Sequence, residues 1–323
     1  MTDSATSAPS AAPAPRRVAV VGLGNMGGPM AANLVEAGHA VTGFDLVPAL
    51  TEAAAATGVT VAGSGAEAVR DADIVITMLP AGRHVLSAYA GSADVEGLLA
   101  AARPGTVFVD SSTIDVADAR TAAEAARAAG HRALDAPVSG GTVGAAAGTL
   151  TFMVGATDED FAEVAPVLSA MARKVVHCGA PGAGQAAKVC NNMILGVSMI
   201  AVSEAFVLGE ALGLTNEALF EVASNATAQC WALNTNCPVP GPVPTSPANR
   251  DFAPGFAAAL MAKDLGLAAN AVSASGVDAQ LGLAAARIYS ALAEGDRAGQ
   301  DFSTVINVIR EHSATPGGPT EVS

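Results

Sequence analysis

The chain has 323 residues, long enough for two domains, and 51% of them are hydrophobic. Its formal net charge of −14 argues against binding to nucleic acid or to an anionic membrane surface. The four cysteines form no CxxC pair and have no neighbouring His at metal-ligand spacing, so the sequence predicts no metal site, no structural disulfide and a cytoplasmic location.

The first segment is predicted to be a disordered leader covering residues 1–16. It is rich in Ala, Pro, Ser and Thr, and it lacks the basic start and apolar block of a signal peptide.

A glycine-rich loop follows the first predicted strand, Val18–Val21, and reads Gly22-Leu23-Gly24-Asn25-Met26-Gly27. In this spacing the first Gly permits a tight turn, the second lets the backbone approach a pyrophosphate, and the third allows close helix–strand packing. A helix predicted to end near Ala37 follows, and its N-terminal N–H groups favour an anion. A purely structural glycine turn or a methyltransferase loop is the alternative.

An acidic residue, Asp45, ends the second predicted strand, Ala40–Phe44, 18 residues after Gly27. A carboxylate there accepts hydrogen bonds from a ribose 2′-OH and repels a 2′-phosphate. Because no Arg follows Asp45, the sequence favours NAD over NADP as the cofactor.

Strands continue to alternate with helices as far as Gly184. One strand, Ile74–Leu79, is closed by Pro80; another ends on Asp110 and a third on Asp135. This pattern predicts an α/β fold with a Rossmann-type, doubly wound parallel sheet in an NAD-binding domain over residues 17–181.

A long helix is predicted from Gln185 to about Leu212, because no Pro intervenes and apolar residues fill nearly every turn. Its longest apolar run, Met193–Val202, is too short to span a bilayer, so we expect a helix buried between domains or subunits. The rest of the chain has helical patterns, broken by a Pro-rich loop at residues 238–247. Residues 182–323 are therefore predicted to be an all-helical substrate and oligomerisation domain, joined through the long helix.

Lysine is rare, with three residues against 13 Arg. A retained Lys is expected where Arg fails, as in proton exchange near neutral pH. Lys188 lies early in the long helix with Asn192 four residues on, and partial burial would lower its pKa towards the range of a general acid–base. The alternative is a lysine that extends from a buried helix to solvent. Lys263 precedes Asp264, and position alone favours a solvated charge pair there.

Two strand ends carry small polar residues. Ser139-Gly140-Gly141 presents successive backbone N–H groups, which suits a carboxylate, although a tight structural turn is the alternative. The segment from Asp110 to Thr113 either hydrogen-bonds a ligand or caps the next helix.

Together these segments resemble the β-hydroxyacid dehydrogenase family over Val18 to Val308. The glycine loop is similar to the family's cofactor loop, and Asp135–Thr151 to its substrate-binding segment. Gly182–Lys188, followed by Asn191 and Asn192, is similar to its catalytic segment. Further similarity to the branch that oxidises 3-hydroxyisobutyrate comes from Asp110–Asp115, Trp231, Asn236–Gly241, Gly255-Phe256 and Leu260–Ala268.

The resemblance implies a role for each matching residue. Lys188 would be the acid–base and Asn192 would orient the substrate. The remaining matches would hold the substrate carboxylate (Ser139, Gly140, Gly141), line the cofactor cleft (Leu79, Pro80, Thr113) or reach the cofactor from the helical domain (Lys263). A polar residue, often Asn, is expected where His84 stands, which leaves a cofactor contact of His84 open.

The implied reaction is NAD-dependent oxidation of 3-hydroxyisobutyrate to methylmalonate semialdehyde, as in valine degradation, by a homodimer or homotetramer. The alternatives are a sibling enzyme such as a tartronate semialdehyde reductase and, from another class, a non-catalytic NADH-sensing protein.

Overall fold

The computed structural model describes residues 14–313, so the predicted leader falls almost wholly outside the described range. The chain divides into two compact units. One comprises the chain up to Ser112 together with Ala117–Gly184, and the other comprises Thr113–Val116 together with the chain from Gln185. The observed division at Gly184 lies three residues after the end of the predicted NAD-binding domain at residue 181.

The first unit is built on one nine-stranded sheet in the order β3-β2-β1-β4-β5-β6-β8-β7, with β9 paired to β8. All pairings among β1 to β6 are parallel, whereas β8 runs antiparallel to β6 and β7 and parallel to β9. The strands are β1 Arg17–Val21, β2 Ala40–Phe44, β3 Thr60–Val61, β4 Ile74–Thr77, β5 Val107–Asp110, β6 Arg132–Asp135, β7 Val138–Ser139, β8 Leu150–Gly155 and β9 Ala172–Gly179.

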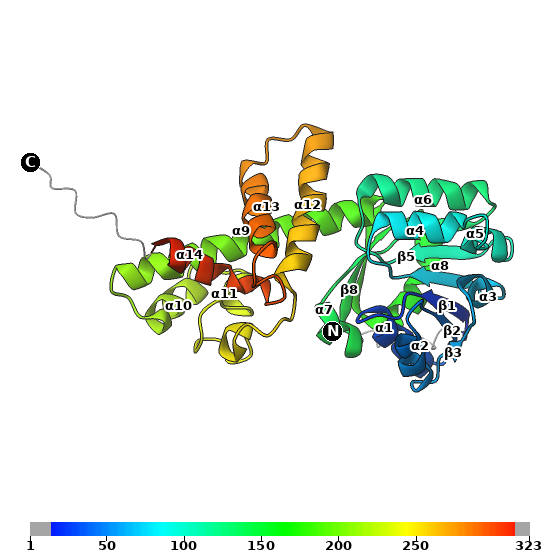
Figure 1. Cartoon of the computed structure of the whole chain (residues 1–323), viewed down its shortest axis with the longest axis horizontal. Coiled ribbons are helices and arrows are strands. Elements are labelled where there is room, and N and C mark those ends of the chain that lie inside the picture. The colour runs from blue at the N-terminus through cyan, green and yellow to red at the C-terminus, as the bar shows by residue number, and fades with distance from the viewer. Residues whose placement is uncertain (1–13, 314–323) are drawn as a thin grey trace, which may run out of the picture. The chain divides into compact units, whose positions relative to one another are not determined.

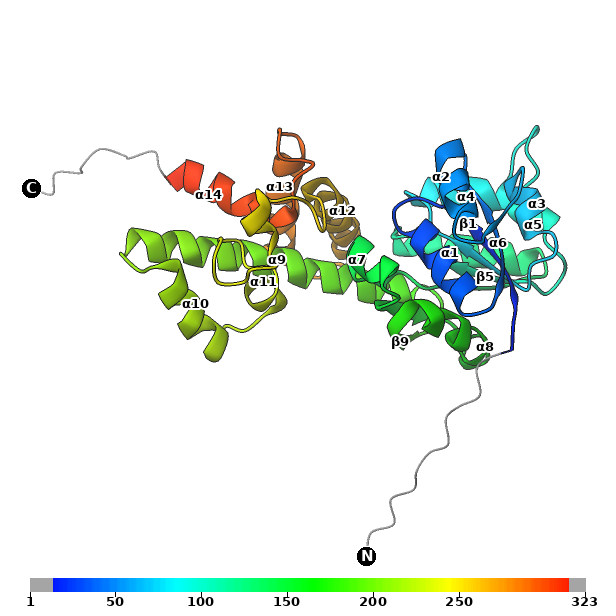
Figure 2. The same cartoon turned by 90° about the horizontal axis from the view of Figure 1, so that it is seen from below.

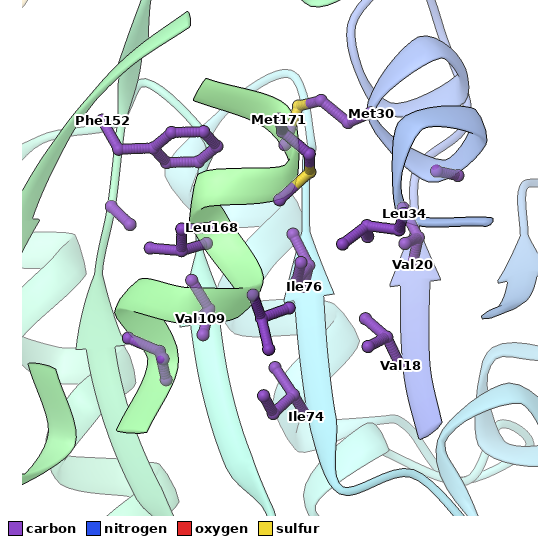
Figure 3. Close-up of a cluster of buried hydrophobic side chains, with 14 of the residues drawn as sticks. Val18, Val20, Met30, Leu34, Ile74, Ile76, Val109, Phe152, Leu168 and Met171 are labelled. Atoms are coloured by element: carbon purple, nitrogen blue, oxygen red, sulfur yellow. The ribbon is translucent and has the colours of Figure 1, made fainter. Parts of the chain in front are cut away.

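Helices cover both faces of this sheet because alternate residues of its buried strands point to opposite sides. On one face Val18, Val20, Ile74 and Ile76 pack against side chains of α1 and α8 (Figure 3). Helices α4 and α6 cover the other face (Figure 1). The predicted doubly wound α/β fold is thus confirmed. The helices of this part are α1 Gly27–Glu36, α2 Pro48–Ala55, α3 Gly65–Val69, α4 Gly82–Ala90, α5 Leu98–Ala101, α6 Val116–Ala128, α7 Gly141–Ala146 and α8 Asp158–Leu168.

The second unit is helical, as predicted, and its α9 runs over Ala183–Ala211, which confirms the long helix. Helices α12 and α13 form a hairpin (Figure 1), and α10 folds back from the end of α9 (Figure 2). The helices after α9 are α10 Asn216–Asn225, α11 Trp231–Asn234, α12 Ala258–Ser275, α13 Gln280–Ala293 and α14 Val305–Ser313.

Helix α9 is only partly covered by the residues that the structure describes. Met199, Ile200 and Phe206 are buried in two helical cores, but Ile194 and Leu208 are exposed. Among the described residues α9 is the one helix that length and composition would allow to cross a membrane, and 39% of its most apolar window is buried. Because α9 packs into these two cores, it is a core helix of the second unit, with one side left exposed.

Within the first unit, the end of β8 packs against Ala183 and Gly184, the residues that precede the second unit. The backbone N–H of Gly182 donates to Asp135 Oδ1 at 2.5 Å. A Cβ placed on Gly155 would collide with that carboxylate and lie 2.7 Å from the backbone nitrogen of Gly184. Only glycine fits at position 155.

We therefore expect Gly155→Ala to lower the free energy of unfolding by about 1–3 kcal/mol, because backbone and a buried carboxylate have to shift. Thermal unfolding measures this. Gly266→Ala is the matched control, since a Cβ at Gly266 in α12 meets nothing within 4 Å. Ala there should leave stability unchanged or raise it by up to about 1 kcal/mol through helix propensity. Equal melting points for the two variants would contradict the packing argument.

Candidate functional site: a dinucleotide loop and a buried lysine

The glycine loop lies between β1 and α1, in a conformation that requires glycine at positions 22 and 27. Gly22 has a φ of +97°, and a Cβ on Gly27 would collide with the carbonyl oxygen of Gly22. By contrast, a Cβ on Gly24 would meet nothing within 4 Å. The loop is therefore tightly packed at both ends and open at Gly24, where a ligand can approach the backbone.

Helix α1 begins at Gly27, and no side chain caps its N-terminus. Backbone N–H groups at an uncapped helix start bind anions, and the partial positive charge of the helix end adds to the attraction. Asn25 and Met26 lie between Gly24 and that helix. The loop thus fits the pyrophosphate of a dinucleotide cofactor.

Asp45 directly follows β2 and is held by the loop itself. Its Oδ2 accepts a hydrogen bond from the backbone N–H of Leu23 at 2.7 Å, and its Oδ1 accepts one from that of Val47 at 2.9 Å. The next residue, Leu46, is 88% exposed. A fixed carboxylate beside an apolar side chain suits a ribose diol and disfavours a phosphate.

The predicted cofactor-cleft residues fall in both units. The N–H of Leu79 donates to Ser112 Oγ at 2.8 Å, and Pro80 is exposed. Thr113 belongs to the segment that groups with the helical unit, where the N–H of Ile114 donates to Gln185 Oε1 at 3.3 Å.

His84, on α4, is partly buried. Its Nδ1 has no hydrogen-bond partner within residues 14–313.

Ser139, Gly140 and Gly141 form the turn from β7 into α7. Gly140 and Gly141 have φ values of +136° and +62°, and no side chain caps α7. Two successive left-handed glycines bring consecutive N–H groups to one surface without side chains, which suits a carboxylate.

Within the helical unit, Lys188 and Asn192 lie on one side of α9, and both are buried, at 7% and 2% exposure. Asn192 Nδ2 donates to Asp264 Oδ2 of α12 at 2.5 Å, and Asn192 Oδ1 accepts a hydrogen bond from Asn191 Nδ2 at 2.9 Å. Both ends of the Asn192 amide are therefore oriented.

Burial sets the protonation of this cluster. Burial lowers the pKa of Lys188, and the nearby positive charge of Lys263 lowers it further. The negative charge of Asp264 raises the pKa of Lys188, but by less than burial lowers it. Burial also raises the pKa of Asp264, against the effects of Lys188, Lys263 and the hydrogen bond from Asn192. The outcome is an amine that gives up its proton more readily than a solvated lysine does.

Asp264 is the residue that sequence reasoning missed, since position alone suggested a solvated pair with Lys263. It is only 5% exposed. The helical period would have revealed it, because Met261, Leu265 and Ala268 on the same helix are all buried and Asp264 shares their face.

The models of two protein families match consecutive segments of the chain. "NAD binding domain of 6-phosphogluconate dehydrogenase" matches residues 17–179. "NAD-binding of NADP-dependent 3-hydroxyisobutyrate dehydrogenase" matches residues 182–309. Together they confirm the predicted nicotinamide cofactor class.

Individual proteins agree. A probable 3-hydroxyisobutyrate dehydrogenase of Mycobacterium bovis is 58% identical, over 91% of this chain and 97% of its own length. An NAD-dependent L-serine dehydrogenase of Pseudomonas aeruginosa is 47% identical, over 90% of this chain and 96% of its own. The solved structure of Mycobacterium tuberculosis 3-hydroxyisobutyrate dehydrogenase with L-serine has a TM-score of 0.87 and 58% identity, covering 92% of this chain and 99% of that one. The chain belongs to the 3-hydroxyisobutyrate dehydrogenase family and is a dehydrogenase.

Proposed function

We propose that the protein oxidises the hydroxyl group of a small 3-hydroxy acid with NAD, and that 3-hydroxyisobutyrate is the first candidate substrate. The product would be methylmalonate semialdehyde, a step of valine degradation. The observation that carries the proposal is the buried Lys188, whose pKa is lowered and whose neighbour Asn192 is oriented by Asp264.

The chemistry divides between cofactor and protein. NAD, when bound at the loop from Gly22 to Gly27, supplies the hydride acceptor. Lys188 in its neutral form accepts the hydroxyl proton as a general base, and Asn192 hydrogen-bonds and orients the substrate. The turn Ser139–Gly141 binds the carboxylate, which fixes which hydroxyl group is oxidised.

Cofactor choice follows from Asp45. A 2′-phosphate would meet an anchored carboxylate and the apolar Leu46, so NAD is preferred to NADP. The proposal extends to Lys263, which would reach the cofactor from the helical domain.

L-Serine is a second candidate substrate, because the P. aeruginosa relative is an L-serine dehydrogenase and the M. tuberculosis structure holds L-serine. It is also a 3-hydroxy acid, with an ammonium in place of the methyl group. Comparing kcat/KM for 3-hydroxyisobutyrate, L-serine and glycerate separates these substrates. It also tests the tartronate semialdehyde reductase alternative, for which glycerate would be preferred. Tight NADH binding without turnover of any of them would instead favour a sensor.

We further propose a cytoplasmic homodimer or homotetramer in which a second copy covers the exposed side of α9. The exposed Ile194, Leu208 and Leu212 support this, because burying them would remove apolar side chains from water.

The lysine role predicts the behaviour of two variants. Lys188→Ala and Lys188→Arg should each lower kcat by at least a hundredfold, because neither side chain accepts a proton near neutral pH. The Kd for NAD, measured by calorimetry, should stay within about threefold of the wild-type value. Wild-type-like turnover in either variant would exclude Lys188 as the base.

The charge pair beside Lys188 predicts opposite shifts of the pH profile. In the oxidation direction kcat rises with pH as Lys188 loses its proton. Asp264→Asn removes a charge that raises the pKa of Lys188, so this rise should move to lower pH. Lys263→Met removes a charge that lowers that pKa, so the rise should move to higher pH. Shifts of the same sign in both variants would contradict this assignment.

The proposed role of Asp45 predicts how a double substitution changes the cofactor preference. Asp45→Ser with Leu46→Arg replaces repulsion of a phosphate by attraction and should lower the ratio of kcat/KM for NAD to that for NADP by about a hundredfold or more. The control is Leu46→Ala, which keeps the carboxylate and should keep the preference for NAD. A double variant that still prefers NAD by the wild-type factor would rule out this role of Asp45.

A further inference from the structure

One carboxylate oxygen joins two strand ends of the first unit. Asp110 is the last residue of β5, is 3% exposed, and lies in register with Thr77 of β4 and Asp135 of β6. Its Oδ1 accepts hydrogen bonds from Thr77 Oγ1 at 2.8 Å, from Ser112 Oγ at 2.6 Å and from the backbone N–H of Ser112 at 3.2 Å.

The same network reaches the turn after β4. Ser112 Oγ, which donates to Asp110, accepts the hydrogen bond from the N–H of Leu79. Asp110 therefore positions the turn that is proposed to line the cofactor cleft, acting through Ser112.

The charge of Asp110 has no counterion among the described residues. None of the ion pairs between residues 14 and 313 includes it, and its buried Oδ2 has no hydrogen-bond partner. The ionisable groups facing it are Asp135 on β6 and Tyr89 on α4. Burial raises the pKa of Asp110 to about 6, and the negative charge of Asp135 also raises it. The three hydrogen bonds lower the pKa but do not outweigh burial. Burial and the Asp110 charge raise the pKa of Tyr89, which stays neutral.

The three hydrogen bonds do not themselves require a carboxylate. The carbonyl oxygen of an asparagine would accept the same donors, so what the carboxylate adds is negative charge, which is costly to bury. Such a charge is useful where a ligand brings a positive one.

The strand order indicates which part of a dinucleotide faces Asp110. The order reverses between β1 and β4, where the pyrophosphate binds in folds of this type. If the adenosine ribose binds at Asp45 after β2, the nicotinamide half would lie on the other side of the switch point, towards β4, β5 and Asp110. The nicotinamide ring is positively charged in NAD⁺ and neutral in NADH.

We propose that Asp110, besides positioning the Leu79 turn, is an electrostatic selector that favours binding of NAD⁺ over NADH. The inference rests on the proposed function, because it needs a nicotinamide cofactor at this edge of the sheet. A single charge several ångströms away in a protein-like dielectric of ~20 alters an affinity by roughly tenfold.

The test compares Kd values for NAD⁺ and NADH at pH 8 in the full-length protein, by calorimetry and by NADH fluorescence. Asp110→Asn should weaken NAD⁺ binding roughly tenfold and change NADH binding by less than about twofold. Ser112→Ala is the matched control, since it breaks the link to Leu79 but keeps the charge, and should change both affinities by one common factor. Equal effects of Asp110→Asn on the two cofactors, or none on either, would overturn the selector.

A second measurement needs no variant. As the pH falls from 8 to 5, protonation of Asp110 in the wild-type protein should raise the ratio of Kd for NAD⁺ to Kd for NADH, with a midpoint near pH 6. A flat ratio with normal binding of both cofactors would overturn the selector alone. Binding of neither cofactor would overturn the proposed function as well.

Discussion

Ionisable groups kept out of water are the constraint on which both functional parts of this molecule depend. A buried charge is costly unless hydrogen bonds or an opposite charge compensate it. In the helical unit this cost lowers the pKa of Lys188 and raises that of Asp264, so both are displaced towards their neutral forms. The hydrogen bond from Asn192 to Asp264 makes the burial tolerable, and it also fixes the amide that would meet the substrate.

In the sheet unit, buried carboxylates are compensated by hydrogen bonds. At its carboxyl edge Asp110 and Asp135 end neighbouring strands. Asp110 accepts a hydrogen bond from Ser112 in the turn that follows β5, and Asp135 accepts one from the backbone N–H of Gly182, just before α9. These two carboxylates fix the backbone around the strand ends. The underlying strands are buried on both faces and are therefore tightly packed.

Much of this architecture could be predicted from the sequence because its signals are local. A run of apolar residues followed by the glycine spacing of Gly22 to Gly27 defines a strand, a turn and a helix start within a few residues, and the structure has all three. The extent of α9 was likewise predictable from the absence of Pro. The burial of Asp264 was not predicted, because whether an acidic side chain is solvated depends on which helix packs against it. Its position next to Lys263 suggested a solvated charge pair instead. The antiparallel pairing of β7 and β8 was not predicted either, because β7 has only two residues, too few to show an alternating pattern.

The hydrogen bonds of Asp45 have a consequence for how binding begins. Two backbone N–H groups already hold its carboxylate in place, so little side-chain freedom would be lost if a ribose bound there as proposed. Binding of the adenosine half at an acceptor that is ordered in advance would therefore cost little conformational entropy. A nucleotide fragment as small as AMP should then retain a disproportionate share of the affinity of the whole dinucleotide.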